Sequence, residues 1–98
     1  MIRHILLIQF KPSATMAQIQ ALMVMFEAMP SKVDGVEAVE WGVNDSPEGK
    51  NKHYTHSVVM TFRDEQGRQS YLPHPEHSAL KEVFRPLIED IVVFDYTK

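Results

Sequence analysis

Apolar and polar residues alternate at the start of the chain and then change to a helical period. Residues 2–10 alternate in two rows and predict a strand. The rows are His4, Leu6, Ile8 and Phe10 on one face, and Ile5, Leu7 and Gln9 on the other. Thr15 with Gln18 forms a capping-box pair, which predicts that a helix begins here. Its apolar positions repeat at helical spacing down to Pro30: Ile19, Leu22, Met23, Phe26 and Met29.

The rest of the chain alternates between strand and helix patterns. Further strands are predicted at residues 36–44, 54–62 and 91–96. Asp64 is expected to cap a short helix that runs through Tyr71, and Pro75 to begin the next helix. This order of elements predicts an α+β fold of the ferredoxin-like, split βαβ kind. Its four-stranded sheet would be antiparallel in the order 4-1-3-2, with the helices on one face.

The face of the sheet away from the helices is also apolar. In the predicted topology it carries Ile5, Leu7, Val59, Val92, Phe94 and Tyr96. An exposed apolar patch of this size is a liability unless a partner covers it. We therefore expect a homodimer in which two sheets pack face to face, because symmetric closed interfaces are the commonest kind.

Composition narrows the class of protein. With 98 residues the chain is expected to form one domain, residues 1–98. A net charge of −3 gives no basic footprint for nucleic acid, and no cysteine is present for disulfides, thiolate metal sites or thiol nucleophiles. The apolar run at the amino terminus is too short for a signal peptide or a membrane span. A cytoplasmic protein with no membrane or nucleic-acid partner is the expectation.

Candidate chemistry gathers around the stretch from Tyr71 to His77. The topology brings His4, near the start of the first strand, beside Asp95, near the end of the last strand. The third strand ends at the same edge and leads to Tyr71 and His77. A histidine held by a carboxylate, with a second histidine and a tyrosine, could remove a proton next to a carbonyl and stabilise the enolate. Alternatively, His4 and Asp95 only satisfy each other's hydrogen bonds.

An apolar pocket could adjoin these polar residues. Its candidate lining is Leu6, Ile8, Leu22, Met23, Phe26 and Val58. The alternative is that the same side chains are simply the core between sheet and helices. His56 is expected at the opposite end of the sheet, and His74, which precedes Pro75, at a helix cap. That placement argues against a metal pair of His74 with His77, and we expect neither metal nor cofactor.

Three pieces of the sequence together resemble a known family. They are residues 4–11 (HILLIQFK), residues 71–77 (YLPHPEH) and residues 93–96 (VFDY). In this order and spacing, from about Arg3 to Tyr96, the chain resembles the stress-responsive dimeric α/β-barrel (Dabb) family. The resemblance implies ferredoxin-like monomers whose sheets form a barrel between two subunits.

The same resemblance extends to a plant polyketide cyclase of the family, which closes a linear poly-β-keto substrate by aldol condensation. It implies that Tyr71 and His77 stand where that enzyme has its acid/base pair. His4, His56, His74 and Asp95 match further polar positions, which makes His56 and His74 additional candidates for substrate contact. Departures lie at Leu22, Met23 and Phe26, where the cyclase is more aromatic.

These observations lead to a homodimer that binds a small, partly apolar carbonyl compound and acts on it as a cofactor-independent, cyclase-like enzyme. His77 would be the general base or acid, Tyr71 the hydrogen-bond donor to the oxyanion, and His4 with Asp95 the positioning pair. One alternative is a non-catalytic stress-response dimer with structural histidines. Another is a cofactor-independent monooxygenase or haem-binding protein of the wider barrel group.

Overall fold

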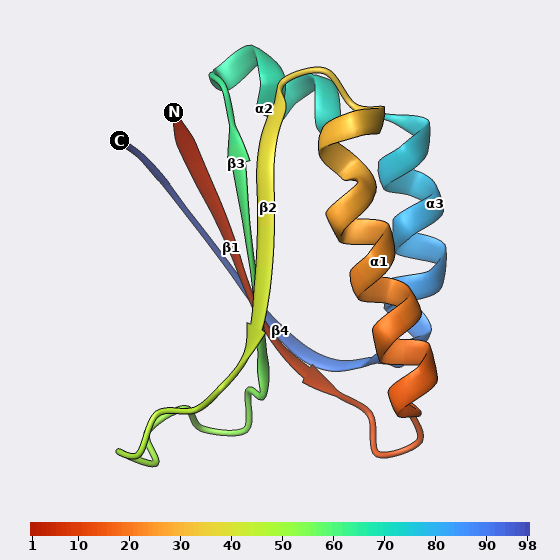
Figure 1. The fold of residues 1–98 in the computed structure, drawn as a ribbon, viewed down its shortest axis with the longest axis vertical. Coiled ribbons are helices and arrows are strands. Elements are labelled where there is room, and N and C mark those ends of the chain that lie inside the picture. The colour runs from red at the N-terminus through yellow and green to blue at the C-terminus, as the bar shows by residue number, and fades with distance from the viewer.

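The computed structural model describes residues 1–98 as a sheet with a layer of helices on one side (Figure 1). Its order of elements confirms the predicted fold class. The elements are β1 (Ile2–Phe10), α1 (Met16–Lys32), β2 (Val36–Val43), β3 (His56–Phe62), α2 (Glu65–Tyr71), α3 (Pro75–Phe84), a 3₁₀ turn (Arg85–Leu87) and β4 (Ile88–Thr97).

The sheet has four strands in the order β2-β3-β1-β4, and all neighbouring strands are antiparallel. Helices α1 and α3 lie side by side along one face, while α2 crosses the end of the sheet and leads from β3 to α3 (Figure 1). The other face has no helix over it. This is the ferredoxin-like α+β arrangement that the order of elements predicted.

Strand register determines which side chains share a face. His4 lies opposite Met60 on β3 and opposite Asp95 on β4. The next residue, Ile5, lies opposite Val59 and Phe94. Successive side chains of a strand point to opposite faces. The row of His4, Met60 and Asp95 therefore faces the helices, and the row of Ile5, Val59 and Phe94 faces away from them.

The core lies between the sheet and the helices. Phe26 from α1 and Phe84 from α3 meet edge to face there, with ring centroids 5.6 Å apart. Such aromatic pairs add about 1 kcal/mol beyond their buried area. The core comprises Ile2, Leu6, Ile8, Leu22, Met23, Phe26, Met29, Val33, Val36, Val58, Met60, Phe62, Tyr71, Leu80, Phe84 and Leu87.

Helix α1 begins as predicted but ends later. The Thr15 hydroxyl accepts from the Gln18 backbone N–H, and the Gln18 side chain accepts from the Thr15 N–H, so the capping box is complete. The sequence predicted an end at Pro30, whereas the helix continues to Lys32. Proline removes one backbone donor, but Val33 N–H still bonds Met29 O at 2.9 Å, and both side chains are buried. Core packing therefore carries the last turn past the proline.

Gly35 and Gly67 bring the start of β2 against α2. Gly35 has φ +94°, a conformation that residues with a Cβ rarely adopt. A Cβ added at Gly67 would lie 2.9 Å from the Gly35 carbonyl oxygen. The glycine inside α2, unfavourable for a helix on propensity alone, is thus explained by close backbone packing.

The last strand starts earlier than its apolar run indicated. Helix α3 ends at Phe84, and Pro86 lies in the 3₁₀ turn that follows it. From Ile88 onward the chain already pairs with β1, because Phe10 lies opposite Ile88. None of the helices combines the length and apolar character needed to cross a bilayer.

Candidate functional site

His4 and Asp95 form a hydrogen-bonded pair across β1 and β4. His4 Nδ1 lies 2.7 Å from Asp95 Oδ1, and both side chains are mostly buried. The carboxylate can only accept, so Nδ1 carries the proton of this bond. His4 Nε2 has no partner within the protein, and the ring forms part of a cavity wall. The pair therefore orients an imidazole with its second nitrogen free.

Asp95 has a second partner that the sequence analysis did not find. Arg68 of α2 donates from Nη1 to Asp95 Oδ2 at 3.3 Å and also pairs with Glu65. One carboxylate thus holds both a histidine and an arginine. Arg68 lies three residues before Tyr71 on α2, so both side chains point to the same face of the helix. This spacing is the feature of the sequence that could have identified Arg68.

Tyr71 is the last residue of α2 and is only 1% exposed. Its ring lies between Phe62, at 5.4 Å between centroids, and His77, at 4.2 Å. Burial raises the pKa of the Tyr71 hydroxyl well above its usual range, so the group stays protonated at neutral pH. It has no partner in the protein. Since no polar side-chain atom is both fully buried and unpartnered, this hydroxyl keeps access to the cavity that Tyr71 lines.

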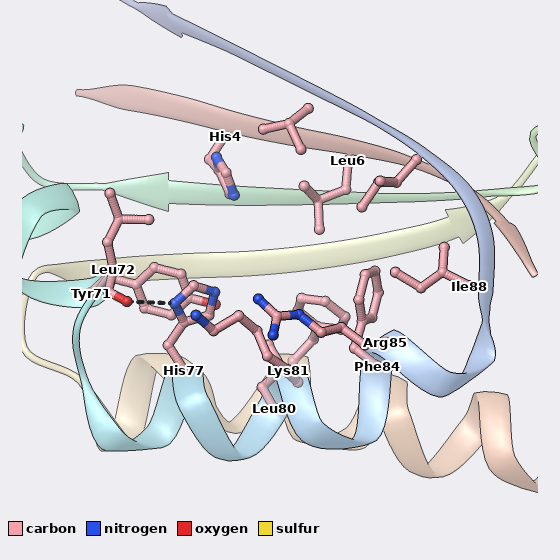
Figure 2. Close-up of a pocket in the computed structure, with 13 residues that line it drawn as sticks. His4, Leu6, Tyr71, Leu72, His77, Leu80, Lys81, Phe84, Arg85 and Ile88 are labelled. Atoms are coloured by element: carbon pink, nitrogen blue, oxygen red, sulfur yellow. Dashed lines mark hydrogen bonds between the residues drawn. The ribbon is translucent and has the colours of Figure 1, made fainter.

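His77 lies in the first turn of α3 with one nitrogen engaged. Its Nδ1 lies 2.9 Å from the Leu72 carbonyl oxygen, the bond drawn in Figure 2. Because a carbonyl only accepts, Nδ1 is the protonated nitrogen and Nε2 has a free lone pair in the neutral ring. Burial, more than the nearby positive charges, lowers the pKa of His77 and outweighs the opposing bond to Leu72. His77 is therefore a neutral base at pH 7.

The local sequence explains how Tyr71 and His77 meet. Asp64 caps α2 by accepting from Gly67 N–H, and His74 caps α3 by accepting from Glu76 N–H at 3.0 Å. Pro75 fits the first position of α3, where a missing N–H costs nothing. The tight turn between the helices, closed by His74 N–H to Tyr71 O, stacks the two rings.

A cavity of about 410 Å³ separates α3 from β1 and β4, with His4, Tyr71 and His77 at one end. Such a volume suits a small ligand, and most of the wall is apolar. It opens beside β4, where Val93 on its wall is 57% exposed. The lining residues are His4, Leu6, Phe26, Tyr71, Leu72, His77, Leu80, Lys81, Phe84, Arg85, Ile88, Ile91 and Val93.

The structure brings together only part of the predicted lining. Leu6 and Phe26 contact the cavity. The other four apolar candidates are fully buried in the core and do not line it: Ile8, Leu22, Met23 and Val58. They face the layer between β1, β3 and α1, whereas the cavity lies on the α3 side. For these four, the alternative of simple core packing describes their position.

The two additional histidines lie outside the cavity. His56 lies opposite Ile8, at the end of the sheet away from His4, as predicted. Its ring stacks on that of Trp41, with the ring centroids 6.4 Å apart. Burial lowers the pKa of His56. His74 uses Nδ1 to cap α3. Nowhere do three His, Asp or Glu side chains come close enough to hold a metal ion.

Several lining residues were not among the sequence candidates. Leu80 and Phe84 belong to the apolar stripe of α3, and Ile91 and Val93 to the row of β4 that faces the helices. Their periodicity was visible in the sequence. Which side of α3 would leave a gap was not, because that depends on how the helix docks on the sheet.

This geometry defines the class of the protein, which is a ferredoxin-like α+β domain with a cavity between its sheet and α3. The chain belongs to the stress responsive A/B barrel domain (Dabb) family, which matches residues 2–98. Among curated proteins it is similar to olivetolic acid cyclase from Cannabis sativa. The two are 29% identical over 96 residues, which cover 98% of this chain and 95% of the cyclase.

Solved structures share the fold. The Arabidopsis thaliana protein At3g17210 superposes with a TM-score of 0.94 at 26% identity, covering 100% of this chain and 95% of that one. A hydroxynitrile lyase from Passiflora edulis gives 0.90 at 23% identity, with coverages of 97% and 90%. A dimeric ferredoxin-like protein of unknown function from Thermobifida fusca gives 0.84 at 24% identity, with coverages of 99% and 90%.

Proposed function

We propose that the protein binds a small, partly apolar carbonyl compound in the cavity and catalyses proton transfer at the carbon next to the carbonyl. One observation carries this proposal. A neutral histidine with a free Nε2 and a protonated, unpartnered tyrosine hydroxyl adjoin each other at one end of an apolar cavity. A base and a hydrogen-bond donor side by side are what enolisation requires.

In the proposed step, His77 Nε2 takes a proton from the carbon beside the carbonyl. The electron pair of that C–H bond becomes the C=C bond of the enolate, and the carbonyl oxygen takes the negative charge. The Tyr71 hydroxyl donates a hydrogen bond to this oxygen without giving up its proton, in keeping with the raised pKa of Tyr71. The enolate carbon then attacks a second carbonyl carbon of the same molecule, whose oxygen takes up the proton held by His77, or the enolate carbon recovers that proton itself.

His4, Asp95 and Arg68 act as a positioning group in this proposal. Asp95 holds the His4 ring, and Arg68 holds the second carboxylate oxygen, so the free Nε2 of His4 keeps one orientation on the cavity wall. That nitrogen would hydrogen-bond a second polar group of the ligand. A fixed contact of this kind increases rate by orienting the reacting carbon toward His77.

A cyclase is the reaction class we favour. The similarity to olivetolic acid cyclase over nearly the whole length of both chains supports it. The cavity also counts against a purely structural role, since a filled core beside Tyr71 would be expected for a non-catalytic protein. Fold alone does not decide the reaction, because neighbours with this fold bear names as different as hydroxynitrile lyase and dimeric protein of unknown function.

Deuterium exchange tests the proton transfer directly. The neutral ester methyl 3-oxooctanoate is incubated in D₂O, and loss of its C2 hydrogens is followed by proton NMR with the buffer rate subtracted. We expect catalysed exchange that falls by about 10²- to 10⁴-fold in His77→Gln, the usual contribution of a general base. The control is His53→Gln, whose imidazole pairs with Asp90 outside the cavity. Exchange that is unchanged in folded His77→Gln would contradict the proposal.

We further propose that two copies pack sheet against sheet. The open face carries a row of Val59, Ile5 and Phe94, with Phe94 60% exposed. Apolar side chains on a sheet face gain about 25 cal/mol for each Å² removed from water. The dimeric neighbours of the same fold support this assembly.

A further inference from the structure

Two positively charged side chains line the cavity. Lys81 of α3 and Arg85, the residue directly after α3, lie about one turn apart, and in Figure 2 both side chains extend into the space below the strands. Neither forms an ion pair. Glu82, their neighbour on α3, shares an outer surface groove with them but lies beyond ion-pair distance of both.

The cavity is positively charged although the chain is not. The whole sequence has 13 Asp and Glu against 10 Lys and Arg. The cavity wall has two cations and two imidazoles but no carboxylate. Lys81 is half-buried and Arg85 is exposed, so water and salt screen their charges in part, but both lie on the cavity wall within reach of what occupies the cavity. Their field reaches His77, since both cations contribute to lowering its pKa.

Spacing along α3 relates the cations to the base. His77 and Lys81 lie four residues apart on α3, and Arg85 follows four residues later as its C-cap, so successive members lie about 6 Å apart along the helix axis. An anionic group beside Lys81 would therefore lie roughly one turn from His77. That separation suits a carboxylate joined to a ketone through one or a few carbon atoms.

We propose that the natural ligand is an oxo acid whose carboxylate pairs with Lys81 and Arg85 while its ketone reaches Tyr71 and His77. Its apolar chain lies along Phe84, Ile91 and Val93 toward the opening beside β4. This inference rests on the proposed function and specifies the substrate class. Arginine suits the role because its planar guanidinium can bind both carboxylate oxygens.

A charged and a neutral form of one molecule test this inference. Binding of 3-oxooctanoate and of methyl 3-oxooctanoate is measured by calorimetry with the wild type, Lys81→Met, Arg85→Met and the double variant. We expect the acid to bind the wild type about five- to tenfold more tightly than the ester, the size of one or two charge-assisted contacts at a partly exposed site. This advantage is expected to disappear in the double variant and to shrink in 1 M salt.

Lys50→Met is the matched control. It removes one positive charge from an exposed loop outside the cavity. The Lys81→Met substitution itself changes helix propensity little. Acid and ester bound equally by the wild type, or an acid preference that survives in the double variant, would overturn the inference and leave the proposed function standing. Absence of binding by both compounds would overturn the two together.

Discussion

The imidazole of His77 lies against the phenol of Tyr71, with ring centroids 4.2 Å apart and the planes inclined by 29°. The same burial acts on the two groups in opposite senses. It lowers the pKa of His77 and raises the pKa of Tyr71, because desolvation disfavours the charged form of each. A neutral base and a protonated donor thus coexist over a broad pH range around neutrality.

Removing only the Tyr71 hydroxyl separates its chemistry from its packing. Tyr71→Phe keeps the ring stacked on His77, so we expect the free energy of unfolding to change by less than about 1 kcal/mol. Catalysed exchange is expected to fall by about 10²- to 10³-fold, the effect of losing one oxyanion donor. Exchange rates and thermal unfolding are measured together. Tyr54→Phe, which deletes a hydroxyl bonded to Asp90 outside the cavity, is the control with full activity.

The pH dependence of stability has a definite sign. His56 and His77 both have a lowered pKa in the folded protein, chiefly through burial. In the unfolded chain each histidine titrates near its ordinary value of about 6.5. Protonation therefore favours the unfolded state, and the stability present above about pH 6.5 is lost as pH falls through the folded pKa values.

Chemical denaturation between pH 5 and 8 measures this effect. We expect the wild type to lose stability below about pH 6.5, and the double variant His56→Gln, His77→Gln to show a shallower slope there. The catalysed exchange rate should fall on the same acidic side as His77 becomes protonated, with an apparent pKa below 6.5. A rate that rises toward acidic pH would show that His77 does not act as the base.

The contact between Gly35 and Gly67 predicts a position that tolerates no side chain. In Gly67→Ala the new Cβ would lie 2.9 Å from the Gly35 carbonyl oxygen and 3.2 Å from its Cα. Relief requires α2 to move away from β2, at a cost of about 1 to 3 kcal/mol. Thermal unfolding measures the loss. At Gly42, where a Cβ meets nothing within 4 Å, alanine should cost far less.

Two carboxylates on β4 offer a matched comparison. Asp95 is mostly buried and binds His4 and Arg68, whereas Asp90 is exposed and binds His53 and Tyr54. We expect Asp95→Ala to cost about 1 to 3 kcal/mol of stability, because it leaves the mostly buried His4 Nδ1 without a partner and removes one of the two partners of Arg68. Asp90→Ala should cost less than about 1 kcal/mol, as exposed pairs do. Equal losses would show that burial does not strengthen the Asp95 pairings.

The proposed dimer is tested with a negative charge on the open face of the sheet and, as a control, a negative charge on the helical side. Phe94→Glu places a carboxylate in the proposed interface between sheets, and we expect sedimentation to show a monomer. Val24→Glu introduces the same charge at a similarly exposed apolar residue of α1 and should leave the dimer intact. A wild type that sediments as a monomer would contradict the assembly itself.

The sequence alone was enough to predict the fold class and the convergence of His4, Asp95, Tyr71 and His77 at one end of the sheet. Strand alternation in β1 separated His4 and Leu6 from Ile5, and the topology then brought Asp95 beside His4. Pro75 placed His74 at the cap of α3 and left His77 in its first turn. These features depend on local propensity and on strand periodicity, which neighbouring residues encode.

Only the tertiary structure decided where empty space remains. Leu22 and Phe26 share the apolar stripe of α1, yet Phe26 contacts the cavity and Leu22 does not. Nothing in the sequence distinguishes Lys81 and Arg85 from ordinary surface cations, and they line the cavity only because α3 and the turn after it dock on the sheet beside this gap. The physical reason is that periodicity identifies which face of a helix is buried, whereas a cavity depends on how closely several faces approach one another.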